Sequence, residues 1–343
     1  MDIINKRLHN YKYLNNKLIK ITIFHCSYLD TFYSLIPAAF WAICMVIFLQ
    51  TVDYHEPKWQ NIDSIIGKSP GLGLRPKQSQ DLIDSAIIMF NKEKQAARSE
   101  EEKEKDKVPR VDEWSGRIKE FLEDYENETR VNALRKDCTF NTVDDKGNTV
   151  IKGARSDSVN EKGETQYGAC HFPVAEIKKT CGANFGYDKG TPCIFLKLNK
   201  IFGLENEAIN QAEQELNKEY PNMDQKMKDA IGSAKNKDHV WVNCYGKYPA
   251  DKEALGDGIE YVPKTRGIPN YYFPYLNQEY YASPLVAVKF SPKSVPGQLI
   301  HIECRAYAKN IGYDRRDKVG ISVFELQIMD QKSADAYNKK FNE

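Results

Sequence analysis

The sequence lacks an excess of charge of either sign. Lys and Arg together number 49, Asp and Glu number 48, and the formal net charge at pH 7 is +1. A protein that binds nucleic acid in bulk needs a basic surface to neutralise phosphates, so this balance argues against a nucleic-acid partner. The length of 343 residues leaves room for two domains.

Motifs of catalysis and metal binding are also missing. None of the six histidines lies in H-E-x-x-H or beside a paired carboxylate motif, and no G-x-S-x-G occurs. "GKS" at 67–69 lacks the upstream glycine of a phosphate-binding loop, and "GLGLRP" at 71–76 ends in proline where a dinucleotide-binding motif needs glycine. We expect His239 and His301 to be solvated. The sequence therefore predicts no catalytic residue, no metal site and no cofactor.

One long uncharged run interrupts an otherwise polar chain, whose mean hydropathy is −0.61. Residues 32–52, "FYSLIPAAFWAICMVIFLQTV", predict a transmembrane helix, because about 20 helical residues span the ~30 Å hydrocarbon core. Pro37 lies near the start of the run, where a helix tolerates proline best. A secretory signal peptide and a buried core helix are the alternatives, although "QTVDYHEPKW" is a poor cleavage site.

The charges beside this run predict its orientation. The preceding residues 1–31 contain five basic and two acidic side chains, whereas Asp53 and Glu56 follow the run directly. The positive-inside rule keeps such a basic N-terminus in the cytosol. We therefore predict a single-pass type II protein with a cytoplasmic tail and an outer C-terminal region.

Cysteine usage agrees with this topology. Cys26 and Cys44 lie in or beside the span and are predicted to be reduced, and the other six lie on the predicted outer side: Cys138, Cys170, Cys181, Cys193, Cys244 and Cys304. An even number in an oxidising compartment predicts three disulfides, although six cysteines allow 15 pairings. A zinc site is the rival interpretation, but the sequence contains no C-x-x-C pair.

A glycosylation sequon, Asn127-Glu128-Thr129, follows an amphipathic stretch. In "DEWSGRIKEFLEDYE" the apolar residues fall at helical spacing on one face. Asn127 at the end of this helix is therefore a predicted glycan site, with an unused sequon as the alternative.

The outer region divides by composition. Residues 53–110 predict a juxtamembrane linker around "GKSPGLGLRPK" and a charged spacer that begins at Asn91. Residues 111–343 contain segments of alternating hydrophobicity, which predict antiparallel strands that bury one face. Residues 205–232 interrupt this pattern and predict two short inserted helices around Pro221. The expected fold is a β-sandwich with inserted helices.

The alternation assigns faces within single strands. In "LIHIECRAY", Ile300, Ile302, Cys304 and Ala306 are predicted to face inward, and His301, Glu303 and Arg305 to face outward. Cys244 also lies on an inward face, in "HVWVNC". A bridge between Cys244 and Cys304 would therefore tie two strands together.

In these features the chain resembles the β-subunit family of the sodium/potassium-transporting ATPase, and most nearly its insect-type members. The likeness rests on the short basic tail, the span that ends in "LQT", the six outer cysteines and five ordered motifs: "PGLGLRP", "GTPCIFLKLNKIFG", "VWVNCYGKYPAD", "YYFPYLNQEYYASPLVAVKF" and "ECRAYAKNIGYDRRD". Together these cover the span and most of the outer region.

The resemblance implies an immunoglobulin-like β-sandwich with the bridges Cys138–Cys170, Cys181–Cys193 and Cys244–Cys304. It implies a non-catalytic chain that helps a catalytic α subunit fold and reach the plasma membrane, and that tunes potassium binding. The D-K-T-G phosphorylation motif of that partner is absent from this sequence. The lipid bilayer and an FXYD-like small subunit are the further partners expected from the resemblance.

The resemblance also implies contact residues for the partner. In the span these are Tyr33, Phe40 and Trp41, and in the outer region they are Tyr271, Tyr272, Tyr275, Tyr307 and Asn310. The stretch 271–290 combines five tyrosines with prolines, and tyrosine suits interfaces because a large apolar ring carries a polar hydroxyl. The alternative is that these rings cap the end of the sandwich core. Ala308 and Lys309 depart from the family pattern, so a polar contact with the partner is expected to differ.

Two other function classes share this topology. A cell-adhesion or junction protein would act through the outer sandwich without pumping. A type II ectoenzyme such as a glycosyltransferase would need a metal-binding D-x-D motif, and the nearest candidate, "SDS" at 156–158, lacks the second aspartate.

Overall fold

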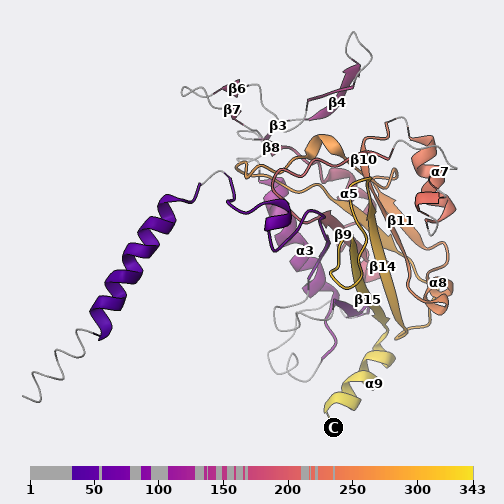
Figure 1. Ribbon diagram of the computed structural model, residues 1–343. Helices are drawn as coiled ribbons and strands as arrows, with labels where there is room; N and C mark the ends of the chain where they lie inside the picture. Colours follow the sequence, from indigo (N-terminus) through magenta and orange to yellow (C-terminus); the bar gives the residue numbers. More distant parts are fainter. Residues whose placement is uncertain are drawn as a thin grey trace, which may run out of the picture. The chain divides into compact units, whose positions relative to one another are not determined.

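The computed structural model describes residues 33–53, 56–77, 86–93, 107–127, 135–136, 138–143, 149–152, 158–159, 165–166, 169–209, 216, 218–220, 223–234 and 236–342. The chain forms two compact units, Met1–Lys58 and Trp59–Glu343, both drawn in Figure 1. The predicted cytoplasmic tail, residues 1–31, lies outside the described residues.

In the described part of the first unit, the α-helix Tyr33–Gln50 has a mean hydropathy of 1.8. None of its side chains is charged and all are exposed within the unit, which is typical of a helix that contacts lipid all round. At 1.5 Å per residue the helix is about 27 Å long, close to the thickness of the hydrocarbon core. The predicted span is therefore a helix whose length and composition suit a membrane crossing.

The second unit is built on two β-sheets, whose main strands run side by side in Figure 1. The first has the order β1 (Leu72–Arg75), β9 (Cys193–Leu198), β13 (Val286–Phe290), β11 (Ile259–Val262). The second has the order β12 (Gly267–Pro269), β10 (His239–Gly246), β14 (Leu299–Tyr307), β15 (Ile321–Met329), β2 (Ile87–Asn91). Every pair within them is antiparallel except β15 with β2.

The two sheets share one hydrophobic core. It contains Ile194, Leu196 and Val288 from the first sheet and Ile302, Phe324 and Leu326 from the second. The rings of Phe290 and Phe324 meet edge to face across it, with centroids 5.8 Å apart. The predicted mainly-β fold is confirmed, whereas its immunoglobulin-like character stays a prediction.

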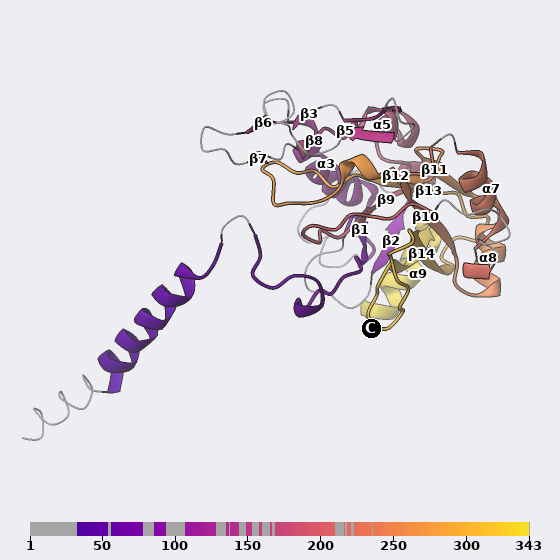
Figure 2. The same ribbon diagram turned by 45° about the horizontal axis from the view of Figure 1, so that its top comes forward.

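The two central strands of the first sheet, β9 and β13, are buried on both faces, which differs from the predicted one-sided burial. In β9 all residues except Lys197 are buried. The outer face of β9 is covered by α3 (Val111–Glu126) and by the chain after α5 (Ala175–Cys181), since Phe195 contacts Phe121 at 6.4 Å and Phe185 at 5.9 Å between centroids. Figure 2 shows α3 beside β9 from a second direction.

The predicted linker and spacer, residues 53–110, supply one strand to each sheet. β1 pairs with β9 and buries Leu72 and Leu74, and β2 pairs with β15 and buries Ile88 and Phe90. The sequence predicts a juxtamembrane linker around "PGLGLRP", and in the structure its alternating leucines form the half-buried strand β1. Residues 94–106 of the predicted spacer lie outside the described residues.

A second hydrophobic cluster covers the outer face of β10 and β14. Trp241 and Tyr307 from these strands pack with residues of the predicted helical insertion: Ile209, Leu216, Tyr220, Met223, Met227 and Ile231. The insertion contains α7, Gln225–Ser233, whose Asp224 cap accepts a 2.7 Å hydrogen bond from the Met227 amide. Residues 210–215, 217, 221 and 222 lie outside the described residues, and they include Pro221, around which two helices were predicted.

The remaining elements are short or peripheral. Three two-stranded ladders pair β3 (Arg135–Lys136) with β8 (Ala169–Cys170), β4 (Thr139–Val143) with β5 (Thr149–Lys152), and β6 (Ser158–Val159) with β7 (Thr165–Gln166). The other helical segments are η1 (Asn61–Asp63), η2 (Tyr187–Lys189), α8 (Pro249–Leu255), η3 (Asn270–Tyr272) and α9 (Gln331–Asn342).

Three disulfides fix the second unit: Cys138–Cys170, Cys181–Cys193 and Cys244–Cys304. These are the pairs that the resemblance implies. The third joins facing residues of β10 and β14, where Cys244 and Cys304 occupy one register position. Cys44 in the first unit is a free cysteine.

Candidate partner-binding surface

The tyrosine loop, defined here as residues 270–285, joins β12 to β13 and is held by its own amide side chains. The Asn270 Nδ2 donates to the Asp238 carboxylate at 2.6 Å. The Gln278 Nε2 donates to the Pro274 carbonyl oxygen at 3.1 Å, and the Gln278 Oε1 accepts from the Leu276 amide at 2.7 Å. A loop fixed in this way loses little conformational entropy when it binds a partner.

Neighbouring elements hold the tyrosine loop from two sides. The Tyr125 hydroxyl, near the end of α3, donates to the Ser283 carbonyl oxygen at 2.7 Å. The Gly203 amide donates to the Tyr275 carbonyl oxygen at 2.8 Å. The loop is therefore hydrogen-bonded to the rest of the second unit at two points.

The tyrosines of the loop are buried to different degrees. Tyr272 is 4% exposed, and its ring lies 5.6 Å from that of Phe172. Tyr271 is half-buried against Tyr272, and Tyr275 is half-buried against Tyr281. The core-capping alternative thus describes Tyr272, whereas Tyr271 and Tyr275 keep part of their surface accessible.

Burial also affects the tyrosine hydroxyls. It raises the pKa of both Tyr271 and Tyr281 above the usual value. Both hydroxyls therefore stay protonated at physiological pH and remain hydrogen-bond donors.

The other two residues predicted to contact the partner outside the membrane, Tyr307 and Asn310, make their contacts within this chain. Tyr307 is 2% exposed and packs edge to face on Tyr220, with centroids 5.8 Å apart. The Asn310 Nδ2 donates to the Glu205 carbonyl oxygen at 2.7 Å, and its Oδ1 accepts from the Glu207 amide at 2.9 Å. Tyr307 therefore has little surface for a partner, and Asn310 holds the segment 205–207.

The predicted contacts of the span lie along one side of its helix. Tyr33, Phe40 and Trp41 are 72%, 67% and 69% exposed. Their spacing of seven and eight residues places them on one face, two turns apart. They form an aromatic stripe that lipid or another transmembrane helix can contact.

The predicted glycan site lies at the end of α3. Asn127 is exposed, and its backbone N–H caps the helix by donating to the Glu123 carbonyl oxygen at 3.0 Å. Glu128 and Thr129 lie outside the described residues, so glycosylation stays a prediction.

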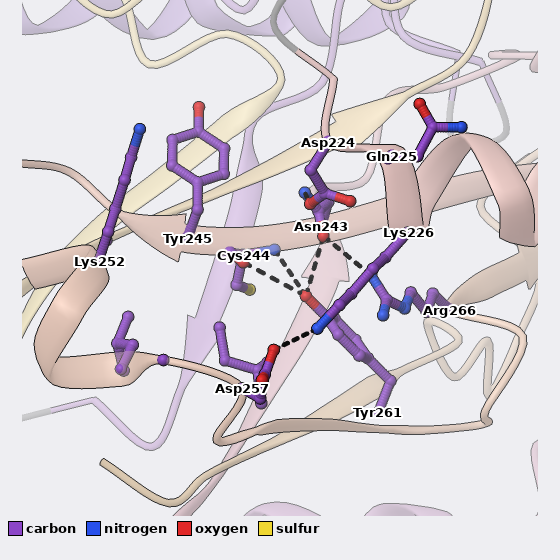
Figure 3. Close-up of a pocket in the computed structure, with 14 residues that line it drawn as sticks. Asp224, Gln225, Lys226, Asn243, Cys244, Tyr245, Lys252, Asp257, Tyr261 and Arg266 are labelled. Carbon is purple, nitrogen blue, oxygen red and sulfur yellow. Dashed lines mark hydrogen bonds and ion pairs between the residues drawn. The ribbon is translucent and has the colours of Figure 1, made fainter. Parts of the chain in front are cut away.

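A pocket of about 380 Å³ lies beside β10. Figure 3 shows its polar groups directed at one another: the Tyr261 hydroxyl and the Arg266 guanidinium both donate to the Asn243 Oδ1, at 3.1 and 3.2 Å, and Lys226 pairs with Asp257. Burial raises the pKa of Tyr261 to about 12, so this hydroxyl stays protonated. These groups form a structural network and are not arranged as a nucleophile with its base.

Glu303 lies on the outward face of β14, as the alternation predicts, but it is not exposed to solvent. Its side chain is 0% exposed. The carboxylate accepts from the hydroxyls of Tyr245 and Tyr313 and pairs with the Arg315 Nε at 3.0 Å. Tyr313 and Arg315 come from the chain between β14 and β15, which folds over the strand, and a strand's own alternation does not predict such a cover.

Neither of the two histidines singled out from the sequence is simply solvated. His239 is 8% exposed beside Trp241, and burial lowers the pKa of its imidazole. His301 lies between two carboxylates, with its Nδ1 3.6 Å from Asp251 and its Nε2 3.5 Å from Glu325. Within the described ranges no group of three or more His, Cys, Asp or Glu residues is placed to hold a metal ion.

Comparisons with known proteins cover both units. Residues 15–324 match the family described as sodium/potassium ATPase beta chain. The chain is 36% identical to sodium/potassium-transporting ATPase subunit beta-1 of Drosophila melanogaster over 304 residues, which cover 87% of this chain and 83% of the relative. Subunit beta-2 of the same organism is 34% identical over 90% of this chain and 84% of its own length.

More distant relatives extend the likeness beyond insects. The probable sodium/potassium-transporting ATPase subunit beta-3 of Caenorhabditis briggsae is 28% identical over 87% of this chain and 78% of its own length. The helix Tyr33–Gln50, all three disulfides and the two-sheet unit as far as the first residues of β15 lie inside the matched region. The expectation of a non-catalytic subunit, drawn from the resemblance, is thereby confirmed. The chain belongs to the sodium/potassium ATPase β-chain family.

Proposed function

We propose that this chain assembles with the catalytic α subunit of a sodium/potassium-transporting ATPase, helps that subunit fold and reach the plasma membrane, and tunes potassium binding from outside. The main support for the proposal is the family match over residues 15–324, which includes the apolar helix and most of the disulfide-linked unit. A partner that spans the membrane can contact both.

The proposed topology places residues 1–31 in the cytosol, the span at 32–52 and the rest of the chain outside. The basic tail and the acidic residues after the span support this orientation. The three disulfides of the second unit support it independently, because such bonds persist in oxidising compartments and are rare in the cytosol. Figure 1 draws the two units without fixing their relative placement.

The proposed contact surface has a membrane part and an outer part. In the membrane it consists of the aromatic stripe Tyr33, Phe40 and Trp41, which is exposed within its unit. Outside it consists of the half-buried Tyr271 and Tyr275 on the tyrosine loop. Tyrosines on a rigid loop are typical interface residues, since little side-chain entropy is lost on binding. The FXYD-like subunit stays a prediction without an assigned residue.

Co-expression with a catalytic α subunit tests this proposal. We expect the full-length chain to raise the amount of α at the cell surface and the potassium-stimulated ATP hydrolysis of membranes. The double variant Tyr271→Ala with Tyr275→Ala should lower recovery of the complex while the disulfides still form. Tyr248→Ala is the matched control, because this tyrosine is 49% exposed but lies outside the tyrosine loop, at the N-cap of α8.

Surface α that does not depend on this chain would contradict the proposed role in delivery. Equal recovery with the double variant and with Tyr248→Ala would contradict the assignment of the loop and favour its core-capping role.

A further inference from the structure

Four basic side chains lie together on the outer face of the first sheet. We call Arg75, Lys77, Lys197 and Lys200 the basic surface. Arg75 ends β1 and faces Phe195 in the strand register, and Lys197 is two residues further along β9. Because residues two apart in a strand share a face, Arg75 and Lys197 project from the same side. Lys77 and Lys200 each lie two residues beyond the end of their strand, β1 and β9 respectively.

Three of these four cations lie against aromatic rings. The Arg75 Cζ and the Lys197 Nζ lie 5.6 and 5.7 Å from the centroid of the same ring, that of Phe121. The Lys200 Nζ lies 4.9 Å from the ring of Tyr275 and 5.3 Å from that of Tyr281. Cation–π contacts of this kind fix the positions of the charges. They also join the basic surface to the tyrosine loop.

The basic surface is not neutralised by this chain within the described residues. None of its four side chains forms an ion pair there with a carboxylate within 4.0 Å, although Asp124 lies close enough to act on Lys200. Burial, followed by the charges of Arg75, Lys200 and Lys77, lowers the pKa of Lys197 to about 8. Like charges held together in this way are expected where a ligand of opposite charge binds.

We propose that an acidic segment on the extracellular side of the catalytic subunit binds the basic surface, with its carboxylates over Arg75, Lys197 and Lys200. This inference rests on the proposed function, because it names the chemistry of the partner beside Tyr275. A folded partner suits the site better than a lipid headgroup does. Lys197 is half-buried over a ring, whereas lysines that bind bilayers extend into water.

Carbodiimide cross-linking of the native complex tests the contact directly. This reagent joins an amine to a carboxylate only when the two already touch. We expect the Lys197 or Lys200 amine to be joined to an aspartate or glutamate of the catalytic subunit, as identified by mass spectrometry. If peptides that contain Lys197 and Lys200 are recovered but are never joined to the partner, the proposal is wrong.

Charge variants provide the second test. In membranes from cells that express the full-length chain with the catalytic subunit, Lys197→Gln with Lys200→Gln should weaken the complex about tenfold at low salt, a difference that disappears at high salt. The matched control is Lys332→Gln with Lys339→Gln, which removes two exposed lysines of α9. Thermal unfolding of the purified variants checks that both pairs are folded.

The outcomes separate this inference from the proposed function. If the wild-type complex forms and both variant pairs resemble it at every salt concentration, the basic surface is not a contact, while the proposed function stands. If the wild-type chain recovers no catalytic subunit, the proposed function itself fails. If the Gln variants lose only binding to vesicles that contain phosphatidylserine, the ligand is a lipid and the proposal is wrong.

Discussion

The Tyr125 hydroxyl donates a 2.7 Å hydrogen bond to the carbonyl oxygen of Ser283, which connects the end of α3 to the end of the tyrosine loop. Both residues are buried, so water cannot take the place of either hydrogen-bonding partner. Tyr125→Phe keeps the ring but leaves this carbonyl without its donor. We expect the free energy of unfolding of the purified chain to fall by about 1–3 kcal/mol. We also expect less of the complex with the catalytic subunit to be recovered.

Tyr337→Phe on α9 is the control for this change, because the Tyr337 hydroxyl makes no hydrogen bond to the described residues. Denaturant titrations of both variants give the comparison. Equal stabilities of the two variants would show that the loop does not depend on α3.

The disulfide between β10 and β14 gives a second prediction. Replacement of Cys304 with Ser removes a bridge between residues 60 apart in sequence and buries a hydroxyl in the core. Loss of a native bridge destabilises a secreted domain by about 2–5 kcal/mol. We expect the variant to be retained in the endoplasmic reticulum, measured by surface biotinylation. Cys44→Ser, which changes a free cysteine of the span, should be delivered normally.

Lys197 predicts how stability varies with pH. Its folded pKa of about 8 lies below the value near 10.4 of an unfolded lysine, so between these pH values the unfolded chain binds more protons. The free energy of unfolding therefore rises with pH through this window. Below about pH 8 the buried Lys197 is charged, and the cost of burying that charge destabilises the folded chain in full. Lys197→Met removes this cost, and with it the dependence of stability on pH.

Thermal midpoints of the solubilised chain at pH 7.5 and 9.5 check this prediction. Relative to the Lys197→Met variant, the thermal midpoint of the wild type should be higher at pH 9.5 than at pH 7.5. Lys332→Met removes an exposed lysine, and the difference between its midpoint and that of the wild type should be the same at both pH values. A constant difference between wild type and Lys197→Met would contradict the depressed pKa.

The buried Glu303 gives a prediction about the outer face of β14. Arg315→Ala removes the cation that lies 3.0 Å from this carboxylate, and the two tyrosine hydroxyls remain as donors. Because the Arg315 side chain is 58% exposed, solvent screens the pair, and we expect a loss of about 1–3 kcal/mol. Denaturant titration measures the free energy of unfolding of this variant. Arg316→Ala, which changes an exposed residue beside Arg315, should lower that free energy by less than about 0.5 kcal/mol.

Strong sequence signals predicted the frame of this molecule. The uncharged run of helical length forms the helix Tyr33–Gln50, and the period-two alternation of "HVWVNC" and "LIHIECRAY" located β10 and β14. These patterns are reliable because each reflects one local requirement, either lipid contact or a buried strand face. The disulfide pairs came from the resemblance, since spacing leaves 15 pairings open.

Features that depend on distant parts of the chain were not predicted. The alternation of β14 placed Glu303 correctly on the outer face but could not show that Tyr313 and Arg315 cover it. The same limit applies to Tyr307, whose cover is the helical insertion, and to Lys197, which is close to Arg75 only because β1 pairs with β9. The spacing within one strand does not indicate which other segment of the chain folds over it or pairs beside it.

Purification of the tagged full-length chain from native membranes in mild detergent, followed by mass measurement of the intact particle, tests the central claim most directly. We predict one copy of this chain bound to one catalytic P-type ATPase subunit. Particles that contain this chain alone, or only further copies of itself, would contradict the account.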